Sequence, residues 1–170
     1  MALLATKLYV PSARTGVLSR SRLAEQLDLG LLRPLILLSA PAGYGKTTIV
    51  STWAANCKDP IAWLTLDQGD NDPVRFWRYI GAALLKATDH LGKSLQSTLF
   101  SVQTPDMEQI IIELVNDVAA SNIKLILVLE DYHLIENPEV HASINFLLDN
   151  IPLKCTSSLQ LVRIRLCASV

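Results

Sequence analysis

Short apolar runs alternate with amphipathic segments along most of the chain. Runs of strand length, which predict strands buried on both faces, occupy residues 35–39, 61–66 and 124–131. Apolar residues recur at helical spacing in residues 46–57, 73–88, 105–120 and 137–150. Strands that alternate with helices of this length indicate a mainly parallel sheet with helices on both faces. The pattern therefore predicts an α/β protein built as a three-layer sandwich.

The loop after the first predicted strand carries a phosphate-binding pattern. The stretch APAGYGKT, Ala40–Thr47, matches G-x-x-x-x-G-K-[ST] at every fixed position except the first, where alanine replaces glycine. Such a loop points backbone N–H groups at phosphate oxygens, at the positive end of the next helix. A Gly-rich turn that contains Lys and Thr by chance is the alternative. The strand before the loop and the helix after it are the context that the motif requires, so we predict a P-loop NTPase core.

The residues of this loop have separate expected roles. Gly43 and Gly45 permit backbone conformations that a side chain would obstruct. Lys46 is expected to contact the β and γ phosphates and to act in catalysis, and the Thr47 hydroxyl to ligate Mg²⁺. Thr48 is expected to contact the α phosphate. The predicted nucleotide-binding residues are Pro41, Ala42, Gly43, Tyr44, Gly45, Lys46, Thr47 and Thr48.

The third apolar run ends in two acids, Glu130 and Asp131. A Mg²⁺ ion that bridges the β and γ phosphates has to be held from the neighbouring strand. We expect Glu130 to face the metal and Asp131 to orient or deprotonate the attacking water. Two solvated acids at a strand end are the alternative. His133 nearby is more typical of a structural hydrogen bond than of a phosphate contact.

The second apolar run is followed by the polar stretch DQGDNDP, residues 67–73. Asp72 precedes a proline, which is the pattern of a helix N-cap followed by proline at the first helical position. Asp70 and Asn71 are expected to form the turn. Asp67 is the one acid of this stretch that we expect at the ligand site, because ligands bind at the carboxyl ends of parallel strands.

Composition excludes several functions. Fifteen Lys and Arg against 16 Asp and Glu leave no basic field, so we expect no direct nucleic acid binding. The 170 residues are 50 % hydrophobic, but the apolar runs are far shorter than the roughly 20 residues that span a bilayer, so no membrane contact is expected. Cys57, Cys155 and Cys167 have no metal-ligand spacing, and no secretory signal is visible. These features predict a cytoplasmic protein.

Four phrases taken in order resemble the N-terminal ATPase domain of the large ATP-binding LuxR-type (MalT-like) transcriptional regulators, a family of the signal-transduction ATPases with numerous domains. They are TKLYVPSARTGVLSRSRL, SAPAGYGKTT, WLTLDQGDNDPVRFWRYI and LVLEDYHLIENPEVH, and they cover most of the chain from Thr6 to Pro152. The last two phrases are far more specific than the phosphate loop alone.

The resemblance implies a switch that binds ATP or ADP with Mg²⁺ and hydrolyses ATP weakly at most. Full-length relatives are expected to self-associate in the ATP state. For this chain by itself, a monomer is the alternative. The resemblance also places Arg20 near the adenine, with a surface salt bridge as the alternative. Glu130 departs from the family, which usually has aspartate there. We expect the extra methylene to push the carboxylate outward and to weaken Mg²⁺ binding.

The resemblance divides the chain into an N-terminal arm with a short helix (residues 1–33), the P-loop core (34–152) and an atypical tail (153–170). The family continues after Pro152 with a fourth strand and an arginine-bearing segment, whereas this tail matches neither. If Lys154 is encoded AAA, a back-translation of the residues that follow it exists whose bases, read from one base earlier, spell MHLVIATRPDPPL. We therefore expect a frameshift after Lys154, with C-terminal strands missing or altered. The alternative is a replacement strand formed by LQLVRIRL, and the gene sequence decides between them.

Two other functions remain as alternatives to the regulatory module, which by this interpretation lacks its sensor and DNA-binding domains. One is a small P-loop kinase or free-standing ATPase. A kinase needs a mobile lid rich in arginine, but only Arg75 and Arg78 lie between the loop and the acidic strand end. The other is a non-functional gene fragment that binds nothing.

Overall fold

The computed structural model describes residues 3–12, 21–88, 97, 107–121, 124–151 and 158–166. The strands of these segments are β1 (Leu35–Ala40), β2 (Ile61–Thr65), β3 (Lys124–Glu130) and β4 (Ser158–Leu166). The α-helices are α1 (Ser21–Gly30), α2 (Lys46–Ala54), α3 (Pro73–Ala87), α5 (Met107–Ser121) and α6 (Pro138–Asn150). Three short 3-10 helices complete the elements, η1 (Ala5–Leu8), η2 (Gln68–Asn71) and η3 (Tyr132–Leu134).

The four described strands form one parallel sheet in the order β1-β4-β3-β2. In this register Thr65 pairs with Glu130 and Ala40 pairs with Leu166, so the carboxyl ends of the strands lie along one edge. We expected the strand that ends in Glu130 to be the direct neighbour of β1. This is wrong, because β4 lies between β1 and β3. The mainly parallel sheet was predicted correctly.

The tail expected to be atypical contributes a strand to this sheet. β4 pairs with β1 through residues 161–166 on one side and with β3 through residues 158–163 on the other. Residues Ser158–Leu166 thus form a strand, as the alternative expected for LQLVRIRL, and the gene sequence decides whether a frameshift produced this tail.

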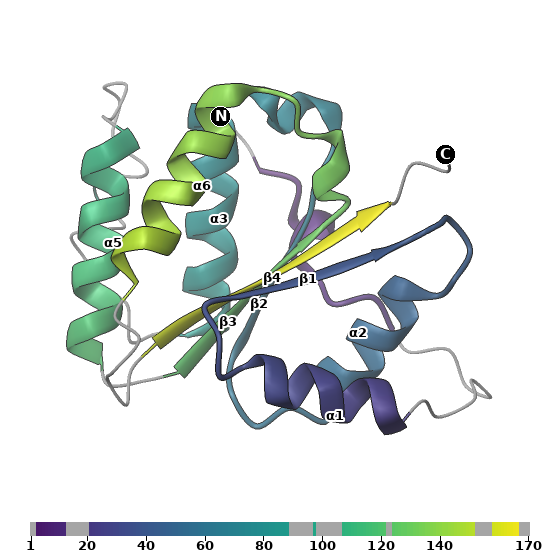
Figure 1. Ribbon diagram of the computed structural model, residues 1–170. Coiled ribbons are helices and arrows are strands. Elements are labelled where there is room, and N and C mark those ends of the chain that lie inside the picture. Colours follow the sequence, from purple (N-terminus) through teal and green to yellow (C-terminus); the bar gives the residue numbers. More distant parts are fainter. Residues whose placement is uncertain are drawn as a thin grey trace.

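Alternate residues of β3 pack into two separate cores. Leu125, Leu127 and Leu129 of β3 belong to a core formed with α3, α5 and α6. Ile126 and Val128 belong to a second core on the opposite face, formed with α1 and α2. Figure 1 shows α3, α5 and α6 on one side of the sheet and α1 and α2 on the other. Because the residues of a strand point alternately to its two faces, the continuous apolar runs produce the predicted three-layer sandwich.

Residues 3–12, which we call the arm, lie outside these layers. In Figure 1 the arm is the purple segment that runs from beside α3 towards α2. Its η1 helix contacts both β2 and α3. The arm therefore lies against two elements that are more than 50 residues away in the sequence.

None of the helices in the described part of the chain has the length and apolar character needed to span a bilayer.

Candidate nucleotide site

The loop between β1 and α2 has the backbone that its glycines were expected to provide. Gly43 has a φ of 82° and Gly45 a φ of 74°, both in the left-handed region that favours glycine. A Cβ atom at either position would meet no atom within 4 Å, so open space borders the loop here. The loop leads directly into α2, whose first residue is Lys46. The free N–H groups of that helix end are thus next to the open space.

The Lys46 side chain lies under the loop and is only 9 % exposed. Its ammonium donates hydrogen bonds to the backbone oxygens of Ala40, at 2.7 Å, and Pro41, at 2.8 Å. An ammonium group has three donors, so these two bonds leave one donor for a further acceptor. The loop conformation therefore holds a positive charge at the base of the site.

Glu130 ends β3 with a buried carboxylate, 6 % exposed. It accepts hydrogen bonds from the hydroxyls of Thr47 and of Thr65, the latter at 2.9 Å. The Trp63 indole N–H donates to the same carboxylate at 3.3 Å. These donors, two of them on β2, hold the carboxylate against the start of α2.

Asp131 follows Glu130 in a left-handed conformation, with a φ of 58°. Burial raises the pKa of its carboxyl group, and the charge of Glu130 raises it further, while His133 and Lys46 act in the opposite direction. The His133 Nδ1 atom lies 3.9 Å from a carboxylate oxygen of Asp131. That nitrogen has no hydrogen-bond partner among the described residues, so the structural hydrogen bond expected for His133 is absent at this atom.

We predict that Asp131→Asn makes the ligand-free protein slightly more stable at neutral pH. A raised folded-state pKa means that the folded form holds its proton over a pH range in which the unfolded form has lost it. The associated stability is present below about pH 4, the value of an unfolded Asp, and is lost as the pH rises through the folded-state pKa. Asparagine also tolerates a left-handed backbone. The side chain is 42 % exposed, so we expect a gain of at most about 2 °C in Tm.

Thermal unfolding of both proteins between pH 3 and 8 measures this effect. The difference in Tm should shrink towards pH 3. A lower Tm for the variant at pH 7 would contradict the prediction.

A pocket of about 450 Å³ lies beside the loop, within the size range of small-molecule sites. The loop and α2 line it together with Asp131 and two residues of the arm, and its lining residues are Pro11, Ser12, Ala42, Gly43, Gly45, Lys46, Thr47, Thr48, Ser51 and Asp131. The structure thus brings most of the predicted residues together. Pro41, Tyr44 and Glu130 are not in the lining, and the Tyr44 side chain is 63 % exposed. Arg20 lies outside the described residues.

Sequence reasoning missed three lining residues, Pro11, Ser12 and Ser51. Ser51 is one helical turn beyond Thr48 on α2, so helical spacing from the motif would have found it. Nothing in the local pattern places Pro11 and Ser12 near the loop, because the arm is 30 residues earlier in the chain.

The donor set fits a nucleotide with Mg²⁺. No group of three or more His, Cys, Asp or Glu that could hold a metal occurs in the described segments. Mg²⁺ in phosphate-transfer sites needs no such group, since it is held by one or two protein oxygens together with phosphate oxygens and water. The Thr47 hydroxyl and the Glu130 carboxylate, which are hydrogen-bonded to each other, are oxygens of that kind.

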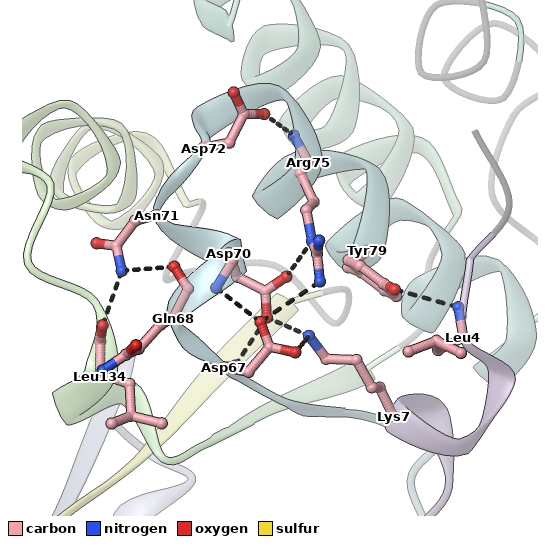
Figure 2. Close-up of polar contacts among 11 residues, drawn as sticks. Leu4, Lys7, Asp67, Gln68, Asp70, Asn71, Asp72, Arg75, Tyr79 and Leu134 are labelled. Atoms are coloured by element: carbon pink, nitrogen blue, oxygen red, sulfur yellow. Dashed lines mark hydrogen bonds and ion pairs between the residues drawn. The ribbon is translucent and has the colours of Figure 1, made fainter.

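Asp67 and Asp70 belong to a different arrangement from the one expected. They form an ion cluster with Lys7 and Arg75, and Figure 2 shows Lys7 reaching from the arm to both carboxylates. Asp70, expected only to form a turn, has no exposed surface and also accepts from Arg75 Nε at 3.0 Å. Asp67 does not line the pocket. Burial opposes its ionisation, but the hydrogen bond and charge of Lys7 outweigh burial and lower the pKa of Asp67.

Asn71, also expected to be a simple turn former, joins η2 to the segment after β3. Its amide donates to the Leu134 carbonyl at 2.8 Å, as Figure 2 shows. Its side-chain oxygen accepts from the N–H groups of Glu136, at 2.7 Å, and Asn137, at 2.9 Å. Asp72 caps α3 as predicted, by accepting from the Arg75 N–H at 2.7 Å.

Known regulators are similar to this chain over most of its length. It is 37 % identical over 150 residues to the HTH-type transcriptional regulator MalT of Cronobacter sakazakii, covering 88 % of this chain and 16 % of that protein. It is 35 % identical over 154 residues to the MalT of Klebsiella pneumoniae, covering 91 % of this chain and 17 % of that protein. The chain is a homologue of the MalT regulators. It spans about one sixth of their length.

Solved structures confirm the fold of this MalT homologue. Cdc6p from Pyrobaculum aerophilum superposes with a TM-score of 0.59 over 97 % of this chain and 43 % of that one, at 13 % identity. Drosophila ORC bound to DNA superposes with a TM-score of 0.54 over 95 % of this chain and 42 % of that one, at 17 % identity. No protein-family model matches the chain. The similarities, with the loop and sheet described above, show a P-loop α/β domain.

Proposed function

We propose that this chain is the ATP-binding regulatory module of a MalT-like transcriptional regulator, in which bound ATP or ADP sets a conformational state. The hydrogen bond between the Thr47 hydroxyl and Glu130 carries the proposal. It joins the residue after the loop lysine to the acidic end of β3, so that phosphate-binding and metal-binding groups meet at one edge of the sheet. The relatives are transcriptional regulators, and this homology supports a regulatory role more than a metabolic one.

The residues around the pocket have distinct proposed roles. The loop N–H groups around Gly43 and Gly45 bind phosphate oxygens, and Lys46 neutralises their charge. Thr47 and Glu130 would hold Mg²⁺, which would supply positive charge to neutralise the phosphate oxygens. Asp131 lines the pocket, and we assign it the orientation of the attacking water and the acceptance of its proton. The raised pKa of Asp131 brings it closer to the operating pH of a general base.

The switch itself belongs to the proposal. Hydrolysis is expected to be slow, because its purpose in such a module is to reset the state. The chain spans 16 or 17 % of the length of its relatives. We therefore assign neither DNA binding nor self-association in the ATP state to the residues described here. Multiple-turnover phosphorylation of a small molecule would instead establish the kinase alternative and overturn the switch.

Calorimetric titration with ATP and ADP, each in Mg²⁺ and in EDTA, tests the proposal. We expect both nucleotides to bind, and we expect Mg²⁺ to increase the affinity for ATP more than the affinity for ADP. Glu130→Gln should remove most of the Mg²⁺-dependent gain, about tenfold in Kd, and leave the EDTA value unchanged, because only the charged oxygen is lost. Glu136→Gln, at an exposed acid, is the matched control. No binding by the folded wild-type protein would overturn the proposal and favour a non-functional fragment.

A further inference from the structure

The arm is fixed to the domain by a partly buried cluster of four charged side chains. Lys7 is 8 % exposed and donates to Asp67 at 3.0 Å and to the fully buried Asp70. Arg75 contacts the same two carboxylates, at 3.4 Å to Asp67 and at 3.0 Å to Asp70. Two cations thus face two anions, and the cluster is neutral. A buried charge whose partner is removed is costly, so this cluster holds Lys7 firmly.

Further contacts hold the arm on both sides of Lys7. The Leu4 N–H donates to the Tyr79 hydroxyl at 3.1 Å, as Figure 2 shows. The Lys86 ammonium donates to the Leu8 carbonyl at 2.9 Å and lies over the Tyr9 ring. All these partners lie on α3, so the first part of the arm is attached to that helix.

The end of the arm forms part of the pocket wall. Pro11 and Ser12 line the pocket together with Thr48 and Ser51 of α2. Ser12 is only five positions after Lys7 in the chain, a stretch that spans at most about 18 Å. The attachment at Lys7 therefore restricts where Pro11 and Ser12 can lie.

The chemistry of this wall differs from that of the loop. Neither Pro11 nor Ser12 has a positive charge, and the phosphate contacts are already assigned to the loop N–H groups and Lys46. An apolar ring and a hydroxyl suit the sugar or base of a nucleotide.

We propose that Lys7 is a positioning residue for the nucleotide pocket, which holds Pro11 and Ser12 in the pocket wall through its ion pairs with Asp67 and Asp70. The inference rests on the proposed nucleotide binding. Lys7 itself does not line the pocket and acts only by fixing Pro11 and Ser12. Release of Lys7 should therefore weaken binding of a whole nucleotide and spare binding of a bare triphosphate chain.

The test uses Lys7→Met combined with Asp67→Asn. Removing both charges keeps Asp70 paired with Arg75, so no unpaired charge is left buried, and asparagine can still accept from the Gly69 N–H that Asp67 caps at 2.8 Å. Asp67→Asn alone and the charge-conserving Lys7→Arg are the controls. Circular dichroism checks that each variant is folded.

Calorimetry with MgATP and with magnesium tripolyphosphate gives the decisive comparison. The double variant should bind ATP about tenfold more weakly and tripolyphosphate as the wild type does, and Lys7→Arg should retain the wild-type ATP affinity. Unchanged ATP affinity in the double variant, or equal weakening of both ligands, would overturn the inference and leave the proposed function standing. A wild-type protein that binds neither ligand would overturn both.

Discussion

Replacing Lys46 with alanine is expected to weaken MgATP binding by about a hundredfold or more. Hydrogen bonds to charged groups contribute about 1.5–3 kcal/mol each, and each 1.4 kcal/mol is a factor of ten in Kd. Lys46 is the only cation in the pocket lining among the described residues, so no other side chain there replaces its charge. Isothermal titration calorimetry measures the change.

The fold should survive this substitution. Lys46 is the first residue of α2, where alanine is a good helix former. The two carbonyl oxygens that it contacts belong to Ala40 and Pro41, which are not buried, so water can replace the ammonium. Lys58→Ala, at an exposed lysine, is the matched control and should bind ATP normally. Wild-type affinity after Lys46→Ala would mean that the loop is not the phosphate site.

Asp70→Ala is expected to lower the free energy of unfolding by about 3–5 kcal/mol, the cost of removing one partner from a buried ion pair. The substitution leaves Lys7 and Arg75 near each other with only the half-exposed Asp67 to neutralise them. A domain has about 5–15 kcal/mol in total, so the variant should be close to unfolding at 37 °C. Urea denaturation followed by circular dichroism measures the change.

Asp72→Ala provides the comparison for Asp70. Asp72 lies two residues away, is not buried and caps α3, and loss of such a cap costs typically about 1 kcal/mol. If the two alanine variants were equally stable, the buried cluster would contribute no more than an exposed cap, and the role given to it here would be wrong.

Local pattern predicted the elements closely. The helix expected over residues 73–88 is Pro73–Ala87, and the strand expected over 124–131 is Lys124–Glu130. Both were recognisable because their signals lie within a few residues of each other: a proline after an N-cap, and an apolar run that has to be buried on both faces. The glycine conformations of the loop follow from its motif in the same way.

Contacts between distant segments could not be predicted. The buried Asp70 is paired with Lys7, which lies 63 residues earlier in the chain and reaches Asp70 only in the folded protein. The same holds for Glu130, whose carboxylate is fixed by Trp63 and Thr65 across the sheet. A polar turn sequence has the same composition whether its acids face solvent or a buried lysine, so no local signal separates the two outcomes.

The position of β4 was beyond sequence pattern for a related reason. An apolar run shows that a strand is buried, but it does not show between which neighbours the strand lies. The parallel pairing with both β1 and β3 depends on connections that run outside the sheet.

The hydrogen bonds of Asn71 have a consequence for genetics. Through them η2 holds the Leu134 carbonyl and the start of α6, so the turn that carries Asp131 is fixed by β3 on one side and by Asn71 on the other. A substitution at Asn71 would act on the capping of α6 and on the placement of Asp131 together. Under the proposed function, alleles at this codon would therefore combine a folding defect with a nucleotide-turnover defect, and a screen for hydrolysis mutants would recover them although Asn71 is not in the pocket lining.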